Sequence, residues 1–439
     1  MLLNRFRGML LAACLCGSIA LPAPMATAGQ LHDLFGVASS SVEQSTDRAV
    51  TRDRKVKRQR LVTVDPAAIV AEILPSGHDR SPGRAALSES LPGTVNLNLF
   101  DDVSITAQRG SVEDAFGGGV VWTGKTDGQG YAILVVDGNR ITGAIESGGR
   151  RFLIESTGNG LVHRVKEVDS EAYPRDQHIE LPKHLMQESQ TGSGPLSPST
   201  TRTTTTITYV TLLAAYTSRA KTILGSTPAQ TIALDVAIVN QGMANSGVPM
   251  RIKLVGTVAV STSYDERSAA DATRPLYDVT SGTGYNFPGI RNSRNSLKAD
   301  LVTMYADRPE YCGIAWVLEQ DLIARYAYSV INARCKGTAA LAHELGHNMG
   351  LRHDRYVEAG ASSSAYNYGY VNTAGKFRDI MSYPNKCAAL GITCRSITYY
   401  SNPWKSYLGY PIGIPTGQPG AANNARKLRE NIAGLAAFR

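Results

Sequence analysis

Three histidines and a glutamate fall within residues 343–353 at spacings that suit metal chemistry. His343 and His347 are four residues apart, so on a helix their imidazoles project from one face about one turn apart. Two imidazoles placed in this way can both reach one zinc ion at roughly 2.0–2.1 Å. Gly350 permits a positive φ at which the helix can end, and His353 can then return as a third ligand.

Three neutral imidazoles leave a fourth position open for water, which is typical of catalytic rather than structural zinc. Zinc lowers the pKa of such a water toward about 7 and polarises a scissile carbonyl. Glu344 is placed to take the proton from the water and to deliver it to the leaving amine. The sequence therefore predicts one catalytic Zn²⁺ and peptide-bond hydrolysis without a covalent intermediate. It makes no prediction about calcium.

A helix over residues 339–349 must carry the motif, and the surrounding pattern predicts a mixed α/β domain over residues 207–439. Thr227 and Pro228 are typical of the cap and first position of another helix. Gly313 and Ile314 begin a predicted strand that could align a substrate backbone by strand addition, or simply belong to the core. The expected strands are 207–216, 250–260, 299–305, 314–318 and 328–333, and the further helices are 228–244 and 423–437.

Residues 29–188 contain short apolar or alternating runs separated by turn signals, which predicts a small β-rich domain. The runs are 94–100, 120–123, 131–136, 141–145, 152–156 and 161–168, with a hairpin turn at 137–139. Residues 189–206 are rich in Ser, Thr, Gly and Pro and predict a linker that proteases can cut. This order indicates a latent precursor whose own β-rich pro-domain inhibits the enzyme.

The first 28 residues predict an export signal. Arg5 and Arg7 precede an apolar stretch over residues 8–21, and a small-x-small pattern indicates cleavage after Ala28. A secreted protein, extracellular or periplasmic, is expected. The alternatives are a short membrane anchor and lipidation at Cys14, for which the preceding apolar stretch is short. No other stretch approaches the roughly 20 apolar residues of a spanning helix, so stable membrane insertion after signal removal is not expected.

Composition and charge exclude other classes. The 439 residues are 43% hydrophobic and 19% charged, which excludes a wholly disordered chain. Residues 29–206 carry 19 basic and 22 acidic side chains, whereas residues 207–439 carry 24 and 15. An acidic region beside a basic one fits an inhibitor docked on its enzyme, although positive charge also favours solubility. The basic cluster in residues 52–60 lacks interleaved aromatic residues, so a nucleic-acid partner is not expected.

Four cysteines remain once the signal is removed, and disulfides are the default in an oxidising compartment. Four cysteines allow three connectivities. The pairs Cys312–Cys335 and Cys387–Cys394 are favoured because each closes a local loop beside the histidine motif. A structural zinc site is the alternative, but no CxxC spacing supports it.

The extended motif resembles that of the metzincin metallopeptidases, and residues 379–384 (Asp-Ile-Met-Ser-Tyr-Pro) resemble the Met-turn of that clan. The resemblance implies a mixed, mostly parallel sheet with a zinc-binding helix. It also implies that Met381 forms an apolar floor beneath the metal. The residues to which the zinc ligands and the catalytic glutamate carry over are His343, His347, His353 and Glu344.

Asp354 is similar to the reprolysin (adamalysin)-like branch, in which that aspartate supports the local fold. The Met-x-Tyr sequence at 381–383 is more similar to astacins and serralysins, and it makes Tyr383 either a transition-state stabiliser or an ordinary packed tyrosine. Residues 29–311 contain no cysteine, so the cysteine-based latency of some relatives cannot operate.

A closer resemblance is to bacterial peptidyl-Asp metalloendopeptidases, which implies cleavage on the amino side of Asp. It rests on the tracts 312–316, 366–370, 377–383 and 401–403 and covers residues 207–439 well and the pro-segment loosely. The pocket for that Asp is expected between the zinc helix and the segment after the Met-turn. There Lys386 or Arg395 would pair with the carboxylate, although each could instead be an exposed cation. Replacing either by Ala is expected to weaken Asp preference more than overall activity.

Three functions remain after the sequence analysis. The first is a secreted zinc endopeptidase acting on protein or peptide substrates. The second is a catalytically inactive binding or adhesion protein on a metzincin scaffold, against which the intact Glu344 argues. The third is a zinc hydrolase acting on sugars or lipids, for which the chain contains no resembling module.

Overall fold

The computed structural model describes residues 33–38, 53–65, 93–180, 206–261, 265–267, 271–281, 287–319, 322–358, 360 and 362–439. The expected signal sequence 1–28, including Cys14 and the cleavage position after Ala28, lies outside these residues. The expected linker 189–206 also lies outside them, except for Thr206. The expectations about export and processing therefore stay predictions.

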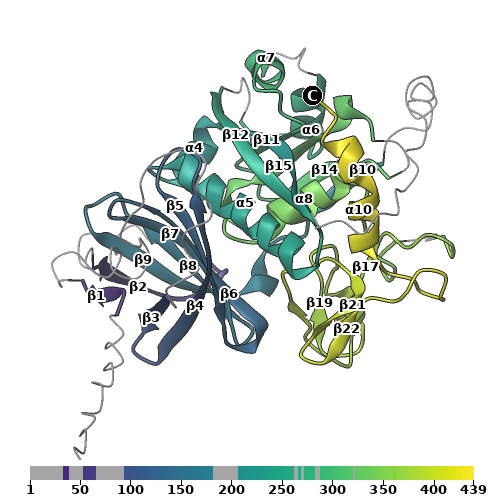
Figure 1. Ribbon diagram of the computed structural model, residues 1–439. Coiled ribbons are helices and arrows are strands. Elements are labelled where there is room, and N and C mark those ends of the chain that lie inside the picture. The colour runs from purple at the N-terminus through teal and green to yellow at the C-terminus, as the bar shows by residue number, and fades with distance from the viewer. Residues whose placement is uncertain are drawn as a thin grey trace, which may run out of the picture. The chain divides into compact units, whose positions relative to one another are not determined.

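An antiparallel sheet of nine strands forms the N-terminal part of the described chain (Figure 1). Its order is β1-β2-β9-β8-β7-β6-β5-β4-β3, so most neighbours in space are neighbours in sequence and short turns connect them. The β-rich character expected from the sequence is confirmed. The strands are β1 (Phe35–Val37), β2 (Val56–Val64), β3 (Thr94–Phe100), β4 (Val103–Asp114), β5 (Val120–Thr126), β6 (Gly130–Asp137), β7 (Arg140–Ser147), β8 (Arg150–Ser156) and β9 (Val162–Val168).

Strand β2 was not expected, because it carries part of the basic cluster. Arg58 donates to Asp102 at 2.6 Å and to Glu167 at 2.8 Å, and Arg60 pairs with Asp101 at 3.1 Å. The arginines therefore form ion pairs with carboxylates of the same sheet.

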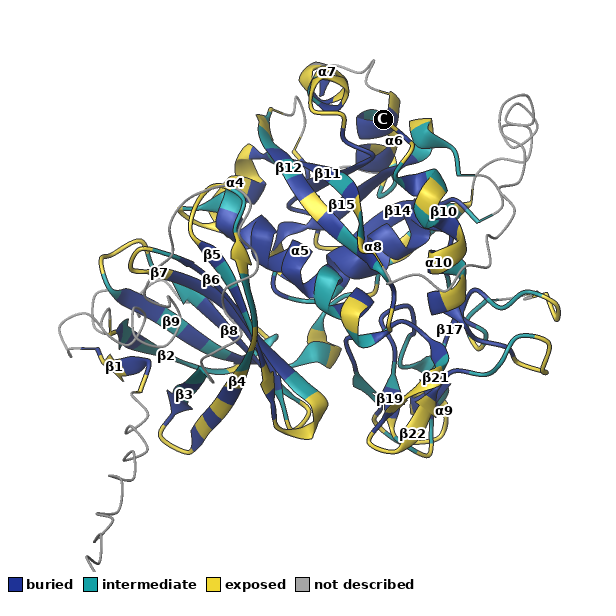
Figure 2. Cartoon of the chain, in the orientation of Figure 1, coloured by how far each residue is buried: buried dark blue, intermediate teal, exposed yellow. Residues whose placement is uncertain are grey.

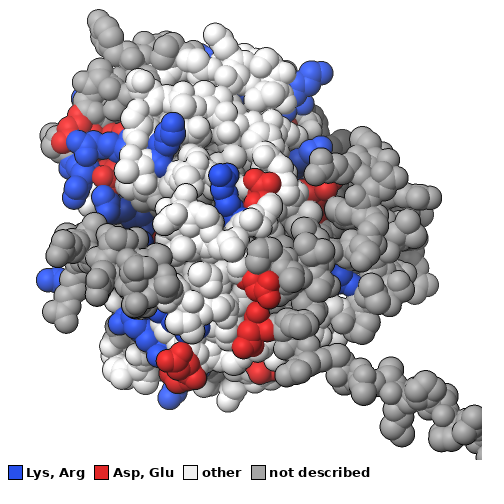
Figure 3. Space-filling model, turned by 90° about the vertical axis from the view of Figure 1, so that its left-hand side faces the viewer, with Lys and Arg blue, Asp and Glu red and all other residues white. Residues whose placement is uncertain are grey.

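On the face of the molecule seen in Figure 3, basic and acidic side chains lie interspersed among uncharged ones.

The second sheet has six strands in the order β10-β14-β15-β13-β11-β12. It is mostly parallel, and β14 runs antiparallel to β15. The mixed α/β character expected for the C-terminal part is confirmed. The strands are β10 (Gln177–Glu180), β11 (Thr208–Thr217), β12 (Met250–Val260), β13 (Leu301–Ala306), β14 (Gly313–Val317) and β15 (Tyr328–Asn332). Its helices are α4 (Ser218–Leu224), α5 (Pro228–Asn245), α6 (Arg274–Ser281), α7 (Pro288–Ser296), α8 (Ala340–Asn348) and α10 (Asn424–Leu435).

Strand β10 precedes the expected linker, yet it joins the sheet of the C-terminal part. It pairs in parallel with β14 in the register Gln177↔Ile314 to Glu180↔Val317. Without β10, β14 would be the edge of this sheet. The N-terminal region therefore occupies the strand edge for which the sequence suggested substrate binding.

Helix α5 is apolar on two sides, and α8 is buried throughout (Figure 2). One side of α5 packs in the core of the α/β part, and the other packs against residues of β6, β7 and β8. The residues on this second side are Ala233, Leu234, Ala237 and Ile238. Helix α8 packs against β14, β15 and α5, which fixes the position of the histidine motif.

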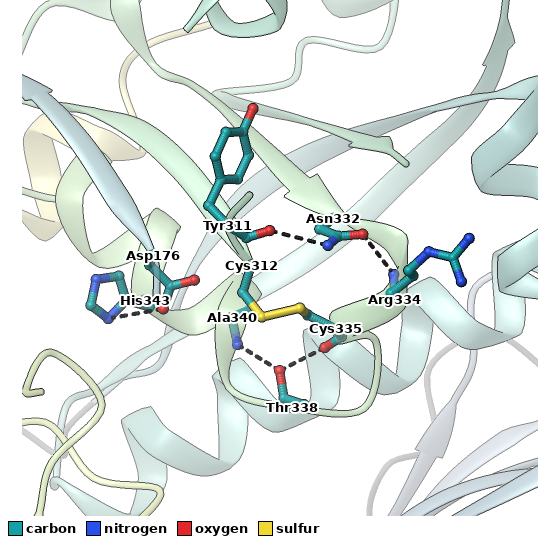
Figure 4. Close-up of a disulfide and its surroundings, with 9 residues drawn as sticks. All are labelled: Asp176, Tyr311, Cys312, Asn332, Arg334, Cys335, Thr338, Ala340 and His343. Atoms are coloured by element: carbon teal, nitrogen blue, oxygen red, sulfur yellow. Dashed lines mark hydrogen bonds and ion pairs between the residues drawn. A yellow bond between two sulfur atoms is a disulfide. The ribbon is translucent and has the colours of Figure 1, made fainter. Parts of the chain in front are cut away.

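Both expected disulfides are present. The Cys312–Cys335 bond ties the start of β14 to the turn before α8, where the Thr338 hydroxyl donates to the Cys335 carbonyl (Figure 4). The Cys387–Cys394 bond closes the loop containing α9 (Asn385–Ala389), before β20 (Arg395–Ser396). Smaller sheets in this part contain β16 (Arg352–Asp354), β17 (Tyr368–Gly369), β18 (Val371–Asn372), β19 (Phe377–Arg378), β21 (Asn402–Tyr407) and β22 (Tyr410–Ile412).

No single helix in the described part of the chain has the length and hydropathy needed to cross a membrane, although the bent pair α4–α5 reaches that threshold jointly.

Candidate functional site

The three histidines of the motif converge on one point. Helix α8 carries His343 and His347 one turn apart. The chain then turns at Gly350, whose φ of 92° lies in the left-handed region that favours glycine, and returns through β16. The Nε2 atoms of His343 and His347 are 3.1 Å apart, and each lies 3.0 Å from Nε2 of His353.

The opposite ring nitrogens indicate the tautomers. Nδ1 of His343 lies 2.8 Å from the Ile380 carbonyl oxygen, and Nδ1 of His347 lies 2.9 Å from that of Leu351. A carbonyl oxygen only accepts, so in these neutral rings Nδ1 carries the proton and Nε2 presents a lone pair. Lone pairs facing one another at this range repel unless a cation lies among them. The donor set therefore fits a divalent metal ion held by three imidazoles.

The third imidazole has a carboxylate partner that the sequence analysis did not identify. Nδ1 of His353 lies 3.3 Å from Oε1 of Glu358, which also accepts from the His353 backbone N–H at 3.2 Å. Such partners orient metal-binding imidazoles and strengthen them as ligands. Glu358 lies in a loop, and no motif spacing connects it to His353.

Burial keeps the rings in the form that binds metal. It lowers the pKa of His343 to about 4 and the pKa values of His347 and His353 well below the usual range. Neighbouring imidazoles add to the effect at His347 and His353. Neutral imidazoles are therefore favoured at neutral pH.

Glu344 lies beside this cluster with both carboxylate oxygens buried and without hydrogen-bond partners among the described residues. Its side chain lies directly against Gly313, where a Cβ atom would collide with it. Burial, and then the nearby Asp176 carboxylate, raise the pKa of Glu344 well above its usual range. An unpaired carboxylate in this position is costly, and it fits a neighbouring cation or reacting water.

The segment 379–384 lies under α8. Met381 is fully buried, and its sulfur occupies the space that a side chain at Gly346 would need. Asp354 accepts from the backbone N–H of Tyr383 at 2.9 Å and from that of Tyr356 at 3.0 Å, so it links the third histidine to this segment.

Tyr383 extends from this segment to the histidine cluster. Its hydroxyl lies 3.1 Å from Nε2 of His353 and donates to the backbone carbonyl of Asp176 at 2.6 Å. Of the two roles that the sequence left open for Tyr383, this position is compatible with contact to a reacting group.

Two further metal-binding residue types reach the cluster from the N-terminal region. The ring of His178 lies 4.4 Å from that of His353 and 5.0 Å from that of His347, measured between centroids. The Asp176 carboxylate lies 3.8 Å from Nδ1 of His343 (Figure 4). Its other oxygen is buried without a partner among the described residues. The sequence leaves open which group of the N-terminal region blocks the metal: His178 is one of four histidines available for this role, with His78, His163 and His184, and several carboxylates are available too. It does not single out His178 or Asp176, because more than 160 positions separate them from the motif.

A cavity lies beside His343, between the start of α8 and residues 378–384. It contains Arg378, which donates to the Glu171 carboxylate at 2.6 Å. Lys386 and Arg395 are not among the residues that line it. The charge of Lys386 acts on the Asp354 carboxylate instead. The Arg395 guanidinium lies against Gly149, in the turn between β7 and β8.

Comparison with known proteins identifies the family of this chain. The model of family M12B reprolysin-like metallopeptidases matches residues 229–354. A peptidyl-Asp metalloendopeptidase of Xanthomonas campestris pv. campestris is 29% identical over 98% of this chain and 97% of its own. One of Stenotrophomonas maltophilia (strain R551-3) is 31% identical over 76% of this chain and 81% of its own. A solved structure, metalloproteinase-II from Bacteroides fragilis, aligns with a TM-score of only 0.38 at 10% identity, over 63% of this chain and 85% of that one. This chain therefore belongs to the metallopeptidase family that contains these bacterial peptidyl-Asp metalloendopeptidases.

Proposed function

We propose that this chain is a zinc-dependent endopeptidase that hydrolyses protein or peptide substrates. The observation that carries the proposal is the convergence of three Nε2 atoms within 3.1 Å of one another beside an unpartnered, buried Glu344. The three histidines would hold the metal. When bound, zinc would supply an acidified water and polarise the scissile carbonyl.

The chain's own groups supply the other requirements of hydrolysis. Glu344 accepts a proton from the attacking water and returns it to the leaving amine, and its raised pKa favours the second transfer. The Tyr383 hydroxyl lies 3.1 Å from Nε2 of His353 and would donate to the developing oxyanion once the Asp176 carbonyl no longer accepts from it. Strand β14 offers backbone N–H and C=O groups to a substrate strand, beginning at Gly313 and Ile314.

We further propose that the full chain is a latent precursor inhibited by its N-terminal region. Strand β10 lies on β14, where a substrate strand would bind. The Asp176 carbonyl accepts the hydrogen bond of the Tyr383 hydroxyl. The His178 ring lies against the rings of His347 and His353. A protein substrate could not reach the cluster without displacing these residues.

Export and Asp preference complete the proposal. The signal pattern in residues 1–28 supports export, and the two disulfides beside the site suit an oxidising compartment. The relatives of similar length carry a name that specifies cleavage at Asp. We propose the same preference for the residue that follows the scissile bond.

The test uses Glu344→Gln in the full-length protein after the linker has been cut and the N-terminal region has been digested. The variant should keep its metal, because the three histidines are intact, and should lose about 10²- to 10⁴-fold in kcat on a casein-derived peptide. A chelator should abolish wild-type cleavage, and added zinc should restore it.

An outcome of wild-type kcat in Glu344→Gln, or of cleavage that resists the chelator, contradicts the proposal. Metal binding without any cleavage by the wild-type protein would favour an inactive binding or adhesion protein instead.

A further inference from the structure

Arg378 is a nearly buried cation of the α/β part. Its side chain is only 11% exposed, and its Nε atom is buried without a hydrogen-bond partner among the described residues. The ion pair with Glu171 is made by the terminal Nη2 atom alone. A planar guanidinium with a free Nε retains the capacity to bind a carboxylate through two parallel hydrogen bonds.

The partner of Arg378 comes from the N-terminal region. Glu171 is 207 residues away in sequence, and its carboxylate is 32% exposed. Arg378 also attracts the Asp176 carboxylate. Burial raises the pKa of Asp176, and the charge of Arg378 offsets part of this rise. Removing the N-terminal region would therefore leave a nearly buried arginine without either of these acidic neighbours.

Arg378 lies in the cavity beside the histidine cluster. Arg378 and His343 line the same cavity, and the remaining lining from the α/β part comes from the start of α8 and from residues 380–384. The cavity therefore adjoins the histidine cluster, between the metal-binding helix and the segment that follows Met381. Among the described lining residues that follow the linker, Arg378 is the one Lys or Arg side chain.

We infer that Arg378 is the specificity residue of this protein: it binds the side-chain carboxylate of the substrate residue that follows the scissile bond. In the full chain Glu171 occupies the same guanidinium as an internal stand-in for that carboxylate. The inference rests on the proposed endopeptidase function and names the residue that selects an acidic substrate. It places this role in Arg378 rather than in Lys386 or Arg395.

The test compares two peptides that differ only in Asp or Asn at the position after the scissile bond. The enzyme is prepared from the full-length protein by cutting the linker and then digesting the N-terminal region, and mass spectrometry locates the cleaved bond. Charge-assisted hydrogen bonding predicts that the wild-type kcat/KM for the Asp peptide exceeds that for the Asn peptide by about 10- to 150-fold. In Arg378→Gln the ratio should fall to roughly threefold or less.

Matched variants separate this assignment from its competitors. Lys386→Gln and Arg395→Gln each remove one cation near the site but outside the cavity, and each should keep the wild-type ratio. The double variant Glu171→Arg with Arg378→Glu reverses the ion pair of the precursor. Once activated, it should prefer Lys or Arg over Asp after the scissile bond.

An unchanged ratio in Arg378→Gln overturns the inference, as does loss of the ratio in Lys386→Gln or Arg395→Gln while Arg378→Gln keeps it. A wild-type enzyme that is chelator-sensitive but cleaves both peptides equally also overturns it, while the endopeptidase function stands. Absence of any cleavage by the wild-type enzyme is the failure of the proposed function itself.

Folding is checked by near-UV circular dichroism and thermal melting. If Arg378→Gln does not fold, Arg378→Lys decides, because it keeps the charge but loses the planar fork. A ratio clearly between those of the wild type and of an enzyme without preference supports the inference. A ratio within roughly twofold of the wild type overturns it.

Discussion

The carboxylate of Glu358 shows how a residue without a motif can support the proposed metal site. It lies against Nδ1 and the backbone N–H of His353, so it orients the one imidazole that does not come from α8. The other two imidazoles use backbone carbonyls for the same purpose. The orientation of His353 therefore depends on the side chain of Glu358, which can be changed by mutation, whereas the backbone carbonyls that orient the other two histidines cannot.

Glu358→Gln should weaken metal binding by roughly 10- to 100-fold, because a neutral amide supports the imidazole less well than a carboxylate does. Competition with a chromophoric chelator measures the affinity directly. Glu430→Gln is the control, since Glu430 accepts from Arg426 and Tyr366 and makes no contact with the cluster. Equal affinities in the two variants would show that Glu358 has no such role.

The turn after α8 is the feature at the scale of elements on which the third ligand depends. The spacing of the motif predicted this helix and its end, because a glycine three residues after the second histidine is a local signal. A Cβ atom at Gly350 would combine a positive φ with close contacts to Asn431 and to the Leu318 carbonyl. Ordinary residues cannot replace Gly350 without strain.

Gly350→Ala should destabilise the protein by about 1–2 kcal/mol or more and should also weaken metal retention, since His353 follows the strained turn. Thermal melting and metal content measure the two effects. Gly289→Ala in α7 is the matched control, because no atom lies within 4 Å of a Cβ built there. If Gly350→Ala melts at the same temperature as Gly289→Ala, the turn is not the constraint described.

The sequence predicted local features well and distant ones poorly. Short-range patterns in the sequence predict the motif, its helix and most strands. The two disulfides also join cysteines that are close in sequence, 23 and 7 residues apart. Strand β10 on β14 and Glu171 on Arg378 join residues that are far apart in sequence. Their partners are set by tertiary packing, for which a single sequence carries no spacing signal. Arg378 itself lies in the tract 377–383, which carries the family resemblance, Met381 and Tyr383 but has no spacing signal that gives a role to the arginine.

At the scale of the whole molecule, polar and apolar contacts hold the N-terminal region on the α/β part in addition to the covalent linker. Lys336 of the α/β part lies 3.3 Å from Glu155 of β8, and Gln230 of α5 donates to Asp137 at 2.8 Å. Burial opposes the ionisation of Glu155, but Lys336 and Lys166 outweigh it and lower the pKa of Glu155 to about 2. These contacts add to the apolar packing of β6, β7 and β8 on α5.

Cutting the linker alone should therefore leave a complex with low activity, and digestion of the N-terminal region should raise the activity. Glu155→Gln should weaken the cut complex roughly 10-fold at neutral pH, because Lys336 loses its acidic partner and keeps only its hydrogen bond to the Ile223 carbonyl. A lowered pKa gives stability that is complete above the ordinary value of 4.5 and is lost as pH falls toward 2. The difference between variant and wild type should therefore shrink in acid. Size-exclusion chromatography and peptide cleavage measure both quantities.

Glu430→Gln again serves as the control, because it should behave as the wild type at every pH. A cut wild-type protein that separates at once and is fully active would contradict the expectation that these contacts hold the two parts together. Equal specific activity before the cut and after removal of the N-terminal region would contradict inhibition by that region.

The second apolar side of α5 has a consequence for the working life of the enzyme. Ala233, Leu234, Ala237 and Ile238 belong to a hydrophobic core only while the β-rich region covers them. Once that region has been digested, these side chains face water, and the exposed stripe favours clumping of the active form. If the chain is the latent precursor proposed above, the uncut chain is the storage form, and each activated molecule would have a limited period of use once its N-terminal region is destroyed.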